Sequence, residues 1–136
     1  MLVWRREPIH LGELADETGN EPGVDWRPDL DIYETPEEFL LVLCVPGVAV
    51  EDIDVSVLGQ TITIAGRRVV ELPGHARPLL LESPRGRFLR RIRLLSRCDM
   101  EGVGTRLSEG QLVIRVPKRR SGMPVPISVT VQETEG

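Results

Sequence analysis

The sequence predicts an all-β protein folded as an antiparallel, immunoglobulin-like β-sandwich. Short segments that alternate apolar and polar residues recur every 8–15 residues, with Gly, Pro, Asn and Asp between them. Helical periodicity is almost absent, and regularly spaced short strands with turn signals are typical of a sandwich. A chain of 136 residues buries roughly 68% of its unfolded surface, enough for one core. We therefore expect seven or eight strands and no internal repeat.

Three parts of the chain differ in composition and residue pattern. We expect an N-terminal arm at residues 1–26, a sandwich domain at 27–120 and a C-terminal extension at 121–136. The arm is rich in charge, and Gly, Asn and Pro at residues 18–24 indicate a linker. Pro8 is suited to the first turn of a short helix. Its apolar side would carry Leu11, Leu14 and Ala15.

Within the domain, alternating or continuous apolar segments predict the strands 29–33, 39–45, 53–57, 61–68, 87–95, 103–107 and 111–116. Residues 39–45 are apolar at all seven positions, so we expect both faces of that strand to be covered. Ile62 and Ile64 should point inward, and Gly66 indicates a bulge or a close approach. The segment 69–86 lacks a regular pattern, and a loop of this size usually has a function.

The clearest hairpin is 103–118, with a turn at Ser108, Glu109 and Gly110. Proline cannot donate to a sheet ladder, so Pro117 should end the second strand. In the preceding strand, Phe88, Ile92 and Leu94 share one face with Arg90. An arginine therefore lies on the apolar side of that strand.

Charge is distributed unevenly along the chain. Residues 1–55 hold 14 acidic and 3 basic residues, net −11, and residues 56–136 hold 7 acidic and 14 basic residues, net +7. The two halves should attract each other. Six arginines lie within residues 85–97, and they suit either ion pairs with the acidic half or a nucleic-acid surface. We favour ion pairing, because the net charge of the whole chain is −4.

Several classes of function lack the residues they need. His10 and His75 stand apart, and no serine or cysteine lies in a nucleophile motif, so we expect no enzyme, no metal site and no cofactor. Cys44 and Cys98 are interpreted as buried free thiols in a reducing cytoplasm. No apolar run approaches the roughly 20 residues that span a bilayer. We therefore expect neither a membrane nor a nucleic-acid partner.

The order of these features resembles the small heat-shock proteins of the alpha-crystallin type, in their bacterial or archaeal form. The resemblance covers about residues 27–130 and is most specific in the hairpin, where Gly110, Leu112, Pro117 and Lys118 match the family pattern. Three positions depart from it: Thr105 replaces the usual alanine, Glu109 an asparagine and Leu95 a proline. The matching segments read PDLDIYETPEEFLLVLCVPGVAVEDIDVSVLGQTITIAGRR, GRFLRRIRLL, TRLSEGQLVIRVPK and PISV.

The resemblance implies an alpha-crystallin domain in an ATP-independent holdase, which binds partly unfolded client proteins and assembles with itself into dimer-based homo-oligomers. It places Arg90 in a dimer and ion-pair network, and residues 69–83 in a loop whose strand is exchanged between dimer partners. Ile127 and Val129 match a motif that docks into a groove on a neighbouring domain. The expected groove lies between strands 53–57 and 103–107 and involves Val55, Val57, Thr105 and Leu107.

The spacing of the tail motif supports docking independently of the family. Ile127 and Val129 point the same way in an extended chain, and Pro124 and Pro126 disfavour helix. Val131 continues the spacing and is a candidate third anchor. Residues 125–131 are also compatible with a last strand of the same sheet, and the whole domain with a co-chaperone or scaffold module that binds one specific partner.

Overall fold

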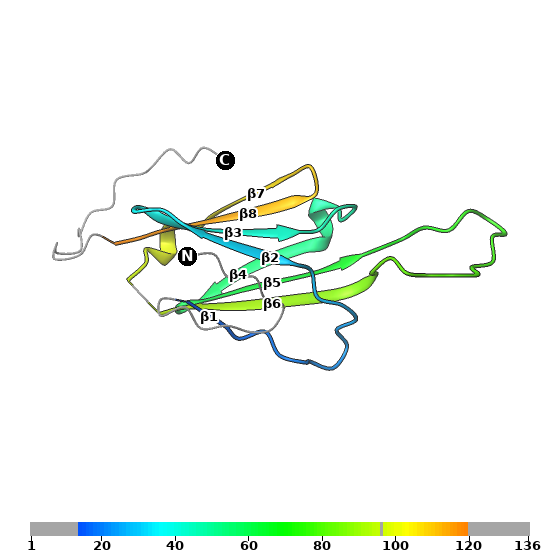
Figure 1. Cartoon of the computed structure of the whole chain (residues 1–136), viewed down its shortest axis with the longest axis horizontal. Helices are drawn as coiled ribbons and strands as arrows, with labels where there is room; N and C mark the ends of the chain where they lie inside the picture. The colour runs from blue at the N-terminus through cyan, green and yellow to red at the C-terminus, as the bar shows by residue number, and fades with distance from the viewer. Residues whose placement is uncertain (1–13, 96, 120–136) are drawn as a thin grey trace.

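The computed structural model describes residues 14–95 and 97–119, and these fold into two stacked antiparallel sheets (Figure 1). The eight strands of this part of the chain and its two short 3₁₀ turns are β1 (Leu14–Asp16), β2 (Leu30–Glu34), β3 (Glu38–Cys44), η1 (Val50–Asp52), β4 (Ile53–Leu58), β5 (Thr61–Arg68), β6 (Gly86–Leu94), η2 (Met100–Gly102), β7 (Gly104–Ser108) and β8 (Gln111–Pro117). The predicted all-β sandwich is confirmed.

Each sheet has four strands, in the orders β1-β6-β5-β4 and β2-β3-β8-β7. The edge strands of the first sheet are therefore β1 and β4, and those of the second are β2 and β7. The chain connecting β5 to β6 extends far beyond the sandwich (Figure 1), and residues 69–84 are exposed. The structure thus agrees with the loop expected there.

The core lies between the sheets and follows the alternation of the strands. Ile62 and Ile64 of β5 are fully buried, as predicted. In β6, Phe88, Arg90, Ile92 and Leu94 are all buried, which confirms the mixed face expected from the sequence. The remaining buried apolar residues are Leu14, Phe39, Leu41, Leu43, Val45, Val48, Cys98, Leu112, Ile114 and Val116.

The prediction that both faces of residues 39–45 are covered is wrong. Phe39, Leu41 and Leu43 are buried, but Leu40 is half-buried and Cys44 is exposed. A strand in the middle of an antiparallel sheet still has one face toward the core and one toward solvent. The predicted burial of the two cysteines is accordingly confirmed for Cys98 and wrong for Cys44.

The hairpin of β7 and β8 closes through a two-residue turn. Glu109 and Gly110 both have positive φ, 52° and 79°, which matches the right-handed twist of the two strands. Gly110 also lies against Pro46, where a Cβ would come within 2.9 Å of the proline Cα. β8 ends at Pro117, as expected.

The predicted helix is wrong where the structure describes it, because Leu14–Asp16 is strand β1, paired antiparallel with β6 through Leu14 and Leu94. The edge of β6 offers unpaired backbone groups, and burial of Leu14 favours the strand over an isolated helical turn. The start of that helix, Pro8 to Glu13, lies outside the described residues. Thr18, expected in a linker, is buried.

Gly66 confirms the expected close approach. A Cβ at this position of β5 would lie 2.4 Å from Cζ of Phe88 and 2.6 Å from the carbonyl oxygen of Asp52. Because neither distance leaves room for a methyl group, glycine lets the Phe88 ring pack directly on the β5 backbone. The same ring meets Trp26 edge-on at a centroid distance of 5.3 Å.

Candidate docking groove

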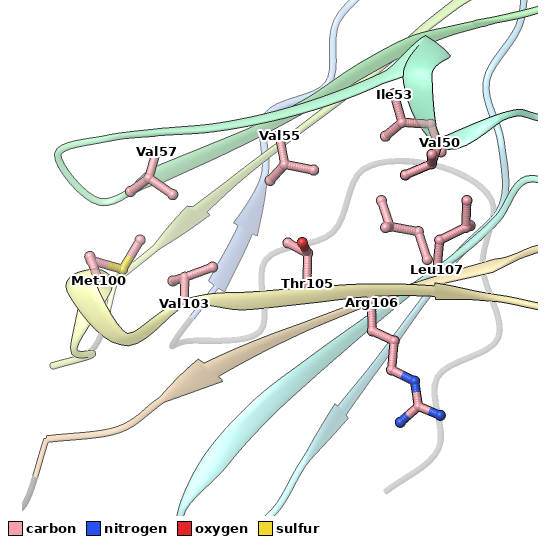
Figure 2. Close-up of a pocket in the computed structure, with 10 residues that line it drawn as sticks. Val50, Ile53, Val55, Val57, Met100, Val103, Thr105, Arg106 and Leu107 are labelled. Atoms are coloured by element: carbon pink, nitrogen blue, oxygen red, sulfur yellow. The ribbon is translucent and has the colours of Figure 1, made fainter. Parts of the chain in front are cut away.

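An apolar groove of about 370 Å³ separates the edge strands β4 and β7 (Figure 2). Both strands lack a neighbour on this side of the sandwich, so their inward-pointing side chains meet across an open space. The lining residues are Val50, Ile53, Val55, Val57, Met100, Val103, Thr105, Arg106, Leu107 and Leu112. We call this the docking groove.

The structure brings together all four groove residues named from the sequence. Val55 and Val57 point down from β4, and Thr105 and Leu107 point up from β7 (Figure 2). Val57 keeps 39% of its surface exposed, which is unusual for an aliphatic side chain on the inner face of a strand. Exposed aliphatic surface of this kind indicates an interaction site.

Ile53 and Val103 lie in the strands expected to flank the groove but were not named as groove residues, and Met100 was not expected there. Ile53 shares the alternation of Val55 and Val57, so the strand pattern already contained its signal. Met100 comes from η2, a single 3₁₀ turn without periodicity, and Val103 precedes β7. Their position depends on how η2 folds against the end of β8, which no local pattern indicates.

The hairpin residues of the family pattern support the groove from below. Leu112 is 4% exposed and closes its floor, and Gly110 allows the tight turn beside Pro46. Pro117 ends β8 and contacts η2, where its Cγ would lie 3.2 Å from a Cβ on Gly102. Of these residues, Leu112 lines the groove, whereas Gly110 and Pro117 lie outside its lining.

Arg90 lies on the opposite side of the sandwich, in a fully bonded polar cluster that we call the clasp: Asp16, Thr18, Pro28 and Arg90. Its Nη2 donates to Asp16 Oδ2 at 2.6 Å, its Nη1 to the Pro28 carbonyl at 2.9 Å and its Nε to Thr18 Oγ1 at 3.1 Å. The side chains of Arg90 and Asp16 are 8% and 7% exposed.

Burial lowers the pKa of Arg90, and the Asp16 carboxylate acts in the opposite direction. The lowered value still leaves a guanidinium charged at any ordinary pH. The free energy of burying this charge therefore depends on the groups that bind it. Removing one partner from such a pair leaves the other buried and uncompensated.

Ion pairs join the two halves of the chain, as the uneven charge predicts. In the described part of the chain, five pairs connect a basic residue between 90 and 118 to an acidic residue between 16 and 38. They are Arg90–Asp16, Arg91–Glu21, Arg93–Glu17, Arg115–Glu38 and Lys118–Glu34. Three arginines of the 85–97 cluster are thus paired, which favours the ion-pair interpretation.

Other kinds of site find no support among the described residues. No group of three or more His, Cys, Asp or Glu side chains is placed to hold a metal ion within residues 14–95 and 97–119. In the same part of the chain, no helix is long and apolar enough to cross a membrane. The tail motif, Ile127 and Val129, lies outside the described residues.

Fold and groove together define a class: an antiparallel sandwich with one apolar groove between two edge strands, a surface suited to binding polypeptide. The sequence pattern of the Hsp20/alpha crystallin family matches residues 31–132. The chain therefore belongs to this family of small heat-shock proteins, which are chaperones that form oligomers and bind client proteins.

Individual relatives agree with this assignment. The chain is 33% identical over 110 residues to a 17.4 kDa class I heat shock protein of Arabidopsis thaliana, covering 79% of this chain and 67% of that one. It is 30% identical to spore protein SP21 of Stigmatella aurantiaca over 79% of its own length, and it spans 64% of that relative.

A solved structure shows the same fold. The crystal structure of a small heat-shock protein from Xylella fastidiosa, described as having a distinct high order structure, superposes with a TM-score of 0.68 at 32% identity. The match covers 79% of this chain and 100% of the other. The predicted family is confirmed.

Proposed function

We propose that the protein is an ATP-independent holdase that binds partly unfolded clients and works as a dimer-based homo-oligomer. The observation that carries the proposal is the docking groove, which leaves Val55, Val57, Thr105 and Leu107 open at a sheet edge. Its occupant is the tail motif, Ile127 and Val129, of a neighbouring subunit. The cytoplasm is the proposed location, favoured by Cys44 and Cys98, neither of which forms a disulfide.

The energetics suit a reversible assembly. Two buried aliphatic side chains contribute about 3–6 kcal/mol before the costs of ordering the tail. A single contact is therefore weak. Because each subunit carries one tail and one groove, many linked contacts hold the oligomer while any one of them opens readily. An open groove then presents apolar surface to a client.

The clasp has a supporting role in this proposal. Arg90 fixes the segment between β1 and β2 against β6. The edge of β2 is thereby held in one position, where the exposed 69–83 loop of a dimer partner is proposed to pair. Arg90 thus contributes to the dimer through the ion-pair network on its own subunit.

Holdase activity is tested by heating an aggregation-prone client with and without the protein, in the absence of ATP, at equal mass. We expect the wild-type protein to lower light scattering by the aggregating client. We expect the variant Ile127→Ser/Val129→Ser to protect the client to a different extent from the wild type. The variant Ser128→Ala is the matched control, because in an extended strand the side chain of residue 128 points to the face opposite that of Ile127 and Val129. If client aggregation is unchanged by the wild-type protein, the alternative of a module for one specific partner takes its place.

A further inference from the structure

The docking groove has room for three anchors rather than two. Its walls form three facing pairs, Val57 with Val103, Val55 with Thr105, and Ile53 with Leu107 (Figure 2). We call each pair a rung. Successive rungs are two strand residues apart, so the outer rungs are about 13 Å from each other. A strand of five residues that presents its first, third and fifth side chains has the same length.

The tail contains one segment of that kind. Residues 127–131, ISVTV, hold Ile or Val at the first, third and fifth positions, and four of the five residues are β-branched. Val125 does not extend the series, because it lies between Pro124 and Pro126. Prolines on both sides favour polyproline II, whose three residues per turn rotate alternate side chains away from a common face.

We propose that Val131 is a third docking anchor and that the groove binds residues 127–131 as one extended strand, with Val129 at the central rung. The inference rests on the proposed function, since it assigns the register of the same contact. The central position of Val129 holds for either direction of the docked strand. Val131 then lies at an outer rung, formed by Val57 and Val103 or by Ile53 and Leu107.

A connection of several residues separates the described domain from this segment. The described tail ends at Arg119, whose amide donates to the Arg97 carbonyl at 3.0 Å beside η2. Eight residue steps separate Arg119 from Ile127, which allows a span of about 26 Å. That span is about twice the distance between the outer rungs, so the connection is longer than the groove itself.

The central rung differs from the outer rungs in carrying a hydroxyl group. Thr105 directs its hydroxyl oxygen into the groove opposite Val55 (Figure 2). Thr105 is the only hydroxyl-bearing side chain among the three rungs, while Met100 and Leu107 lie at the two ends of the groove. The tail has the larger Ile127 at one end and Val129 in the middle.

The rate of subunit exchange in the full-length protein tests the third anchor, measured by mixing isotopically labelled and unlabelled oligomers in a native mass spectrometer. The variant Val131→Ser should exchange about tenfold faster than wild type, since a buried valine side chain is lost from each contact. Thr130→Ser is the matched control, because residue 130 points away from the groove, and its exchange rate should equal that of wild type.

Two results separate this inference from the proposed function. If Val131→Ser exchanges at the wild-type rate while Ile127→Ser/Val129→Ser exchanges faster, the contact has two anchors and the third is overturned. If the double variant also exchanges at the wild-type rate, the tail does not link subunits, and both proposals are overturned. The groove would then hold another occupant, such as the N-terminal residues or client protein.

Disulfide trapping tests the register in chains that carry Cys44→Ser to remove the exposed thiol. With Val129→Cys, the proposal predicts a cross-link to Thr105→Cys. With Val131→Cys, it predicts a cross-link to Val103→Cys or Leu107→Cys and none to Thr105→Cys. A cross-link between positions 131 and 105 would place Val131 at the central rung and overturn the register.

Discussion

The two sides of the sandwich differ in what lies beside the edge strands of its sheets. On the closed side, the segment between β1 and β2 covers β6 and ends in the clasp, where Arg90, Asp16 and Thr18 satisfy one another. On the open side, β4 and β7 leave an apolar groove between them. The polar groups of the clasp have their partners within the same chain, whereas an open apolar groove is stabilised by an occupant.

The difference shows where stability and function reside in this fold. A buried charge is tolerated on the closed side because each of its three nitrogens donates to an acceptor within the same chain. The side chains of the groove contribute less to the fold because water already reaches them. Substitutions on the closed side should therefore unfold the protein, and those on the open side should change its assembly.

The largest effect is expected from Arg90→Ala on the closed side. The substitution leaves the Asp16 carboxylate, 7% exposed, without its partner, and breaking a buried pair costs about 3–5 kcal/mol. Denaturant titration of the full chain measures the free energy of unfolding. Arg93→Ala is the control, because its pair with Glu17 is 54% and 40% exposed and is expected to contribute at most about 1 kcal/mol. Equal losses in both variants would contradict the clasp.

Gly66→Ala should have the next largest effect, because the new Cβ would lie 2.4 Å from Phe88 Cζ. Overpacking of a filled core typically costs about 1–3 kcal/mol. Gly104→Ala, with no heavy atom within 4 Å of its Cβ position, should change the free energy of unfolding by less than about 1 kcal/mol. Thermal melts of the two variants compare them directly. A melt of Gly66→Ala that matches the wild type would rule out the tight contact with Phe88.

On the open side, Val57→Ser should leave the fold almost intact and weaken assembly. The side chain is 39% exposed, so its truncation costs less than about 1 kcal/mol of folding free energy. Loss of its contact with the tail should shift the oligomer toward smaller species on dilution, as sedimentation velocity measures. Loss of folding stability without a change in mass would mean that Val57 belongs to the core and not to an interface.

Thr105→Val should have the smallest effect, and in the opposite direction. The substitution keeps the shape of the side chain and removes a hydroxyl group, which loses its bound water when the tail docks. We expect subunit exchange to be slower than in the wild type, with an unchanged fold. Faster exchange would indicate that the hydroxyl of Thr105 bonds to the tail.

Sequence patterns predicted the parts of the molecule that depend on local alternation. The inward face of β6 and the turn at Glu109 and Gly110 follow from period-two spacing and turn chemistry. The resemblance to a family supplied the place of the groove and the roles of the tail motif and of Arg90, which spacing alone does not give.

What the sequence did not predict depends on contacts between distant segments. Leu14 is in a strand because the edge of β6 is available, 80 residues along the chain. Thr18 appeared to be part of a linker and is buried because Arg90 binds it across 72 residues. Met100 reaches the groove through the packing of η2 on β8. Local propensity contains none of this information.

Light scattering tests the central claim, that the open groove is the place where the tail joins subunits. The molar mass of the full chain is measured for wild type and for Ile127→Ala/Val129→Ala at the same concentration. We predict a large oligomer for the wild type and a dimer for the variant, with the same melting temperature for the domain. The same large mass for both would contradict the account.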